Sequence, residues 1–292
     1  MIVAFLAALE VGTRVAVQKA SRLERRIAAE YAQTLRVQRT PADKQVLVVG
    51  NSLLLADVQF DSLRASLAPE WSATRLAVEQ TYFLDWYYGL RHMTATGVDP
   101  DAVVLVLSAD QLVLSEIRGD YSIYRLMGPR EAFDVARELR LHPTMTAGYL
   151  LSSLSAFYGL RTEYRKVLLG RLMPDMQNLT PHIVRISRPT LPDSVVYQRA
   201  YDRLARFKAL LDQHHTQAVF VLAPLLGSQP WNQIVLRAAR DAHITVLKPF
   251  DEHTFSESEY LSDRFHMNDS GAHRFTAMLA RPLRDALSPV GQ

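Results

Sequence analysis

Two uninterrupted apolar runs restrict the fold of this chain more than any other feature. They lie at residues 102–107 (Ala-Val-Val-Leu-Val-Leu) and 218–223 (Ala-Val-Phe-Val-Leu-Ala). Half-exposed strands alternate apolar and polar residues, whereas strands of a parallel sheet that is covered on both faces are apolar throughout. Further strands are expected at residues 44–49, 74–78 and 243–247. Helical patterns separate the strands, at residues 57–67, 84–93, 195–213 and 229–241. Because parallel neighbours need crossover connections, this alternation predicts a doubly wound sheet with 102–107 at its centre.

A long segment, residues 115–190, interrupts this alternation. It has helical patterns at 129–140 and 144–170 and no convincing strand, so we expect a helical insertion. An insertion after the third strand lies near the carboxyl ends of the strands, where ligands bind in such folds. It could cover a pocket or form a packing subdomain. Its aromatic residues could stack on sugar rings or belong to the core: Tyr121, Tyr124, Tyr149, Phe157, Tyr158 and Tyr164.

The N-terminal segment, residues 1–40, has a different character from the rest. Residues 2–17 are largely apolar and are followed by a charged, Ala-rich helical pattern over 15–35. The apolar run is shorter than the roughly 20 residues that a spanning helix needs, and no basic residues precede it. Three interpretations stay open: the remnant of a membrane anchor, an interfacial amphipathic helix, or a helix docked on the core. Residues 41–292 would form one domain.

The most chemically informative motif follows the first expected strand. Gly50-Asn51-Ser52-Leu53 would place Ser52 where a strand ends and a helix begins, which is where α/β folds expose a nucleophile. Ser at such a turn is equally a favoured helix N-cap. A serine hydroxyl becomes a useful nucleophile only when an imidazole accepts its proton and a carboxylate orients that imidazole.

Near the other end of the chain, Asp263-Arg264-Phe265-His266 supplies both of these groups. A spacing of three residues can put the carboxylate and the imidazole on one side of a turn, so that Asp263 orients the Nδ1–H of His266 and leaves Nε2 free for Ser52. The alternative is a loop histidine bound to a backbone carbonyl. Asn268 to Gly271 would cap the last helix, beneath which Phe275 would pack.

These two motifs together resemble those of the SGNH (GDSL) hydrolases. Gly50-Asn51-Ser52-Leu53 resembles their first block with Asn in place of Asp, and Asp263-x-x-His266 resembles their C-terminal catalytic block. The resemblance implies a three-layer α/β/α flavodoxin-like sheet. It also implies a Ser52–His266–Asp263 triad.

The expected oxyanion donors depart from the family pattern. The family usually supplies a glycine after the second strand and an asparagine after the third, but this chain has Glu79-Gln80-Thr81 and Ser108-Ala109-Asp110-Gln111 at those places. The candidate donors are Asn51, Gln80, Thr81 and Gln111. Loss of one such donor typically costs about a hundredfold or more in turnover, which puts fast general esterase activity in doubt.

The divergent branch that the sequence resembles includes membrane-anchored transferases that move acyl groups onto polysaccharides or teichoic acids. That resemblance predicts acyl transfer or ester hydrolysis on a cell-envelope or exopolysaccharide glycan, with an extracytoplasmic domain, an acyl donor and a membrane acyltransferase partner. A small-ester or lipid esterase with the same triad is one alternative. A non-catalytic glycan-binding or assembly subunit with the same fold is the other.

Composition excludes several other classes of function. The net charge is +3 with scattered basic residues, which gives no support to nucleic-acid binding. There is no cysteine and hence no thiolate metal site, and the His214-His215 pair lacks nearby carboxylates that would complete one. Neither a phosphate-binding loop nor a dinucleotide-binding glycine motif is present, so no nucleotide cofactor is expected.

Overall fold

The computed structural model describes residues 1–165 and 190–288. Its centre is a five-stranded parallel sheet with the strand order β2-β1-β3-β4-β5, the flavodoxin-like order of doubly wound folds. The strands are β1 (Lys44–Gly50), β2 (Trp71–Ala77), β3 (Ala102–Leu107), β4 (Gln217–Leu222) and β5 (Thr245–Leu247). The prediction of a parallel sheet with 102–107 at its centre is confirmed, although β2 begins three residues earlier than expected.

The carboxyl ends of the first three strands are aligned. Gly50 pairs with Ala77 of β2 and with Val106 of β3. A Cβ atom at Gly50 would lie 2.6 Å from the carbonyl oxygen of Val106, so this position needs glycine for the close approach of two strands as much as for the turn that follows. The segments after β1, β2 and β3 therefore meet at one edge of the sheet.

Helices cover both faces of the sheet and complete a three-layer α/β/α fold. One face carries α3 (Ser52–Asp57), α4 (Phe60–Leu67) and α15 (Asp269–Leu287), which contact one another. The other carries α5 (Phe83–Ala95), α13 (Asp193–Asp212) and α14 (Trp231–Asp241). The single helix expected over 57–67 is in fact α4 alone, because the chain is extended at Val58 and α3 ends before it.

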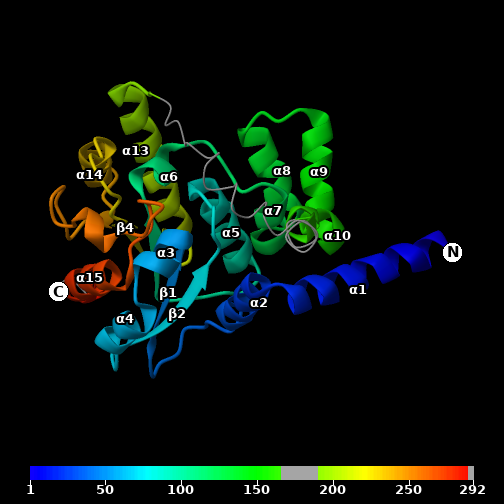
Figure 1. Ribbon diagram of the computed structural model, residues 1–292, viewed down its shortest axis with the longest axis horizontal. Helices are drawn as coiled ribbons and strands as arrows, with labels where there is room; N and C mark the ends of the chain where they lie inside the picture. Colours follow the sequence, from blue (N-terminus) through cyan, green and yellow to red (C-terminus); the bar gives the residue numbers. More distant parts are fainter. Residues whose placement is uncertain (166–189, 289–292) are drawn as a thin grey trace.

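The helical insertion is present within the described residues. It comprises α6 (Ala109–Val113), α7 (Asp120–Leu126), α8 (Pro129–Glu138), α9 (Pro143–Leu154) and α10 (Ala156–Gly159). The pattern over 144–170 is broken at Ser155, whose side chain caps α10, and residues 166–170 of that prediction lie outside the described part. Helices α7 to α10 gather on the side of the molecule from which the N-terminal helix projects (Figure 1). A short 3-10 helix, η1 (Glu257–Glu259), precedes the loop that leads to α15.

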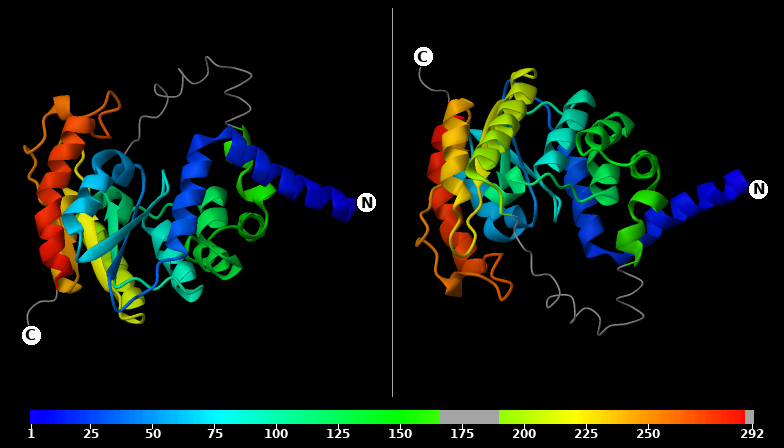
Figure 2. Two further views of the ribbon diagram at one scale, coloured as in Figure 1. Left: turned by 90° about the horizontal axis from the view of Figure 1, so that it is seen from below. Right: turned by 90° about the horizontal axis from the view of Figure 1, so that it is seen from above.

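Two helices, α1 (Ile2–Ala20) and α2 (Arg22–Thr34), form the N-terminal segment. Ser21 caps α2 and interrupts the helix expected over 15–35. Helix α1 projects from the body of the molecule, away from the C-terminus (Figures 1 and 2), while α2 packs against β2. Glu10 fastens α1 to the insertion, since its carboxylate accepts hydrogen bonds from the amides of Ala156 and Phe157 at the start of α10. Within the described residues, no helix combines the length and the apolar character that crossing a membrane requires.

Candidate active site

The turn after β1 leaves the Ser52 hydroxyl free for chemistry. Asn51, not Ser52, is the N-cap of α3: its Oδ1 accepts the amide N–H of Leu53 at 3.0 Å. Its Nδ2 donates to the carbonyl oxygen of Thr81 at 2.9 Å, which ties the end of β1 to the turn after β2. Because Asn51 is the N-cap, Ser52 occupies the first helical position and has no capping role. The alternative that Ser52 is only a helix N-cap is therefore wrong.

The loop before α15 is shaped by Asp263. Its Oδ1 accepts the backbone N–H groups of Phe265 (2.9 Å) and His266 (3.0 Å), and its Oδ2 lies 2.7 Å from His266 Nδ1. Burial opposes ionisation of Asp263, but these bonds outweigh it and hold the pKa of the carboxyl below its ordinary value. The carboxylate can only accept, so Nδ1 carries the proton and Nε2 of His266 is left as an acceptor.

Ser52 and His266 are brought together from positions 214 residues apart. Ser52 Oγ lies 2.8 Å from His266 Nε2, so the hydroxyl donates to the imidazole, which in turn donates to Asp263. The His266 side chain is 24% exposed, which leaves the pair accessible to a substrate. Sequence analysis expected these three residues to act together, and the structure places them in one hydrogen-bonded relay.

Sequence analysis missed Asp57, which supports the loop that carries the histidine. This residue ends α3, is fully buried, and accepts the N–H of Met267 through Oδ1 at 2.9 Å. Burial raises its pKa well above the ordinary value, and the negative charge of Asp263 raises it further. Asp57 therefore links the end of the helix that begins with Ser52 to the loop that carries His266. The detectable signal was a lone carboxyl at the end of the otherwise apolar stretch Leu53–Ala56.

Three of the four oxyanion candidates have side chains that are already hydrogen-bonded. The Asn51 amide binds Thr81, as above. The Thr81 hydroxyl donates to the carbonyl of Val78 at 2.6 Å and accepts from the Trp86 indole at 2.9 Å, so it has no second proton to give. The Gln111 side chain accepts the N–H of Ser108 in the capping box of α6. These contacts leave backbone N–H groups as the donors to consider at Asn51 and Thr81.

Gln80 differs from the other three candidates because its backbone is left-handed. It has φ 59°, a conformation that favours glycine. Within the described residues, four other non-glycine residues have positive φ: Arg140, His215, His243 and Arg264. The first three follow the C-termini of helices, where this conformation is common. Of the other two, Arg264 lies in the loop of Asp263 and His266, and Gln80 precedes Thr81, whose carbonyl accepts from Asn51; backbone strain of this kind tends to gather at functional sites.

A cavity of about 470 Å³ opens beside Gln80. The helical insertion supplies most of its wall, which includes Arg118, Asp120, Tyr149, Tyr158, Arg161 and Glu163. Its charges are paired with one another, since Arg118 binds Glu163 at 3.0 Å and Arg161 binds Asp120 at 2.5 Å. Three of the tyrosines considered for sugar stacking, Tyr121, Tyr149 and Tyr158, thus line this cavity, although Tyr121 is also part of the core and Tyr149 packs against it.

Comparisons with known proteins return only distant likenesses. No family model and no curated protein matches the sequence. Among solved structures, the chain is similar to LAE5, an alpha/beta hydrolase enzyme from the metagenome of Lake Arreo in Spain, with a TM-score of 0.44 and 9% identity over 89% of this chain and 100% of that one. It is similar to a GDSL-like lipase from Bacteroides thetaiotaomicron, with a TM-score of 0.44 and 10% identity over 90% and 97% of the two chains. It is also similar to Axe2, an acetylxylan esterase from Geobacillus stearothermophilus, with a TM-score of 0.42 and 9% identity over 84% and 94%. At these identities the likeness concerns the fold alone, so the chemistry must be argued from the site.

Proposed function

We propose that this chain is a serine-dependent esterase or acyltransferase that works through an acyl-serine intermediate. The observation that carries the proposal is the relay from Ser52 Oγ to His266 Nε2 (2.8 Å) and from His266 Nδ1 to Asp263 Oδ2 (2.7 Å). Both distances are within the range at which a general base takes a proton from a nucleophile. The freedom of Ser52 from helix capping supports the same assignment.

The reaction proceeds in two balanced steps. Ser52 Oγ attacks the ester carbonyl while its proton passes to His266 Nε2, and the resulting tetrahedral intermediate expels the alcohol, which takes that proton and leaves an acyl-serine. A second hydroxyl, from water or from a sugar, then gives its proton to His266 and attacks the acyl-serine, which releases Ser52 and reprotonates it. Asp263 stabilises the imidazolium that forms in both steps.

The negative oxygen of each tetrahedral intermediate would be stabilised by backbone N–H groups. We assign this role to the N–H of Ser52 and to that of Gln80, whose left-handed conformation reproduces that of a glycine in the same turn. Backbone donors held rigidly in a site of low dielectric provide much of the stabilisation in acyl transfer. The side chains of Asn51 and Thr81 serve structural hydrogen bonds instead, while Gln111 uses only its side-chain oxygen in the capping box of α6.

The acceptor side of the proposal is transfer to, or hydrolysis of, an ester on a glycan. The charge-paired cavity beside Gln80, with its three tyrosine rings, would suit a neutral polyhydroxylated ring, because sugars combine apolar CH faces with hydroxyl groups. We further propose that the protein acts at the cell envelope. The exposed apolar side chains of α1, Met1, Phe5, Val11 and Val15, would bind a membrane surface or a membrane acyltransferase.

The test is covalent labelling with a fluorophosphonate probe, located by mass spectrometry. We expect labelling at Ser52 in the wild type, and none in Ser52→Ala or His266→Ala with the fold retained by circular dichroism. Ser66→Ala is the matched control, because its hydroxyl donates only to the carbonyl of Leu63 within α4. A well-folded wild type that resists labelling would contradict the proposal and favour the glycan-binding subunit.

A further inference from the structure

The turn that holds Gln80 is conformationally costly and therefore needs support. A glutamine with φ 59° carries a steric cost that glycine does not, and such residues persist only where their surroundings over-determine them. The side chain of Gln80 is exposed and does not provide this support. The contacts that fix the turn must come from its neighbours, Glu79 on one side and Thr81 on the other.

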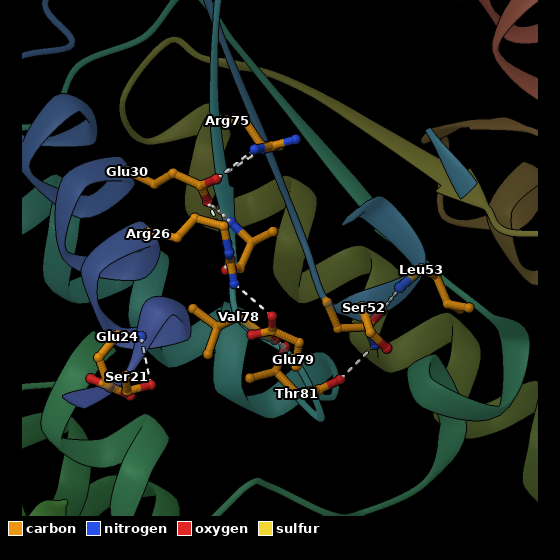
Figure 3. A network of polar contacts seen from close by, with 12 residues as sticks. Ser21, Glu24, Arg26, Glu30, Ser52, Leu53, Arg75, Val78, Glu79 and Thr81 are labelled. Carbon is orange, nitrogen blue, oxygen red and sulfur yellow. Dashed lines mark hydrogen bonds and ion pairs between the residues drawn. The ribbon is translucent and has the colours of Figure 1, made fainter. Parts of the chain in front are cut away.

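Arg26 of α2 holds the turn from the N-terminal segment. Its Nη1 donates to the carbonyl of Ala77 at 2.9 Å, and its Nη2 binds the Glu79 carboxylate at 2.6 Å. One planar guanidinium thus bridges the last residue of β2 and the residue that precedes Gln80. Figure 3 shows this bridge, with Arg26 reaching from α2 to Glu79 and with Thr81 beyond it toward Ser52.

Arg118 holds the same turn from the helical insertion. Its Nη1 donates to the carbonyl of Glu79 at 2.9 Å, while Nη2 binds Glu163 and the guanidinium lies 3.7 Å from the ring centre of Tyr121. Its side chain is only 6% exposed. Arg26 fixes the side chain of Glu79 and Arg118 fixes its backbone, so the peptide that carries the Gln80 N–H is held at its carbonyl end.

We propose that Arg26 and Arg118 are positioning residues that together fix the Gln80 N–H as an oxyanion donor, so that helix α2 belongs to the catalytic machinery. This inference rests on the proposed function. Neither arginine needs to contact substrate, because each acts through the Glu79–Gln80 peptide. Small displacements of a preorganised donor from the position where charge develops reduce turnover without abolishing substrate binding.

Arg26 and Arg75 form a matched pair, and comparing their variants can distinguish the positioning role of Arg26 from a general effect on stability. Glu30 accepts hydrogen bonds from both Arg26 and Arg75, as well as from the amide of Ala77. Arg75 binds Glu30 and lies over the Phe60 ring but makes no hydrogen bond to the 77–79 backbone among the described contacts. Removing either guanidinium weakens the Glu30 cluster, but only the loss of Arg26 releases the turn.

The experiment compares Arg26→Met, Arg26→Lys and Arg75→Met in the full chain, using p-nitrophenyl acetate turnover and the rate of fluorophosphonate labelling. For Arg26→Met we expect kcat to fall by about tenfold to a hundredfold, with KM and the pH midpoint of kcat unchanged because the triad is untouched. Lysine should recover only part of this loss, since one ammonium cannot reproduce the planar two-site contact. Arg75→Met should keep the wild-type kcat.

Specific outcomes would overturn the inference. Wild-type kcat in Arg26→Met, or equal losses in the Arg26 and Arg75 variants, would show that the bridge does not position a donor. If Arg26→Met fails to fold, Glu79→Ala tests the same contact from the turn, and an unchanged kcat there would be equally decisive. A wild type that labels at Ser52 while Arg26→Met behaves normally removes this inference alone, whereas a wild type without labelling or turnover removes the proposed function and this inference with it.

Discussion

The candidate site has two sides: the nucleophile side, with Ser52, Asp263 and His266, and the oxyanion side, with the turn at Gln80. Different kinds of hydrogen bond hold these two sides in place. On the nucleophile side several of the supporting hydrogen bonds are local, since Asn51 caps Leu53 and Asp263 accepts from Phe265 and His266, and the bond from Met267 to Asp57 adds a long-range contact. On the oxyanion side, the turn at Gln80 is supported by residues 39 and 53 positions away, through Arg118 to the Glu79 carbonyl and through Arg26 to the Glu79 carboxylate. A short motif can encode the first arrangement, while the second is distributed over three segments of the chain.

The two sides also differ in the solvent exposure of their side chains. The side chain of Asp263 is 47% exposed, and that of Arg118 only 6%. Removing an exposed group costs little stability, whereas removing one partner of a buried charged network leaves the other uncompensated. Substitution of Asp263 should therefore reduce activity with little loss of stability, and substitution of Arg118 should reduce activity and stability together.

The largest expected effect is a fall in kcat when the hydrogen bond between Asp263 and His266 is lost but the loop keeps its shape. In Asp263→Asn the Oδ1 atom still accepts the N–H groups that shape the loop, but an amide NH₂ replaces the oxygen facing His266 Nδ1. The imidazole then favours the wrong tautomer, and kcat should fall by about a thousandfold or more. Steady-state kinetics and a thermal melt measure the two quantities. A similar kcat in the wild type and Asp263→Asn, or a large loss of stability in the variant, would contradict the prediction that this substitution affects activity alone.

The next effect concerns the pH dependence of the free energy of unfolding. It arises from Asp85, which binds the backbone of Tyr82 close to Gln80. Asp85 is fully buried and accepts the amides of Tyr82 and Arg118, and burial raises its pKa to about 7 despite these bonds. In the unfolded chain its pKa returns to about 3.9. Between these values the folded state holds a proton that the unfolded state lacks, so the free energy of unfolding should decrease as pH rises from about 4 to 7, by a few kcal/mol.

Asp85→Asn tests this dependence, because an amide does not titrate. Its denaturation midpoints, measured across that pH range, should depend less steeply on pH than those of the wild type. Asp61→Asn, at an exposed carboxylate on α4, should leave the wild-type slope intact. Parallel curves for the wild type and the Asp85 variant would show that Asp85 is ionised in the folded protein throughout.

Sequence alone predicted the parts of the molecule that repeat a simple pattern. The apolar runs at 102–107 and 218–223 gave β3 and β4 to within one residue, because strands buried on both faces have few acceptable compositions. The contacts of Ser52 and Asp263 with His266 were also predictable, since each residue lies in a local motif. The helix boundaries at Ser21 and Val58 were missed, because a single residue with extended backbone interrupts a periodicity that otherwise continues.

The oxyanion side could not be predicted in the same way. Nothing near Gln80 in the sequence shows that its backbone is left-handed, because the contacts that fix its turn come from Arg26 and Arg118. Long-range hydrogen bonds of this kind leave no periodic trace in composition or spacing. The hydrogen bonds of Thr81 and Gln111 are local instead, and the Ser108-x-x-Gln111 capping box has a recognisable sequence signature.

A smaller effect concerns the link between the nucleophile and the histidine loop. In Asp57→Ala the buried N–H of Met267 loses its acceptor, which should cost about 1–3 kcal/mol of stability and lower kcat as the loop loosens. Asp57→Asn is the matched variant, because it keeps an acceptor oxygen for the Met267 N–H in a side chain of nearly the same shape. Chemical denaturation and kinetics should show the asparagine variant close to the wild type and the alanine variant below it. Equal losses in both would mean that the acid proton of Asp57 is itself required.

The smallest expected effect comes from removing the backbone strain at Gln80. Gln80→Gly keeps the backbone N–H, deletes the side chain and relieves the cost of φ 59°, so the free energy of unfolding should change by about 1 kcal/mol or less. If the donor is the backbone N–H, kcat stays within a few-fold of the wild type. Adding Arg26→Met to the Gln80→Gly variant should then cost less than adding it to the parent, because glycine adopts this conformation without outside support. A large fall in kcat on Gln80→Gly would instead identify the side-chain amide as the donor and leave the arginines a purely structural role.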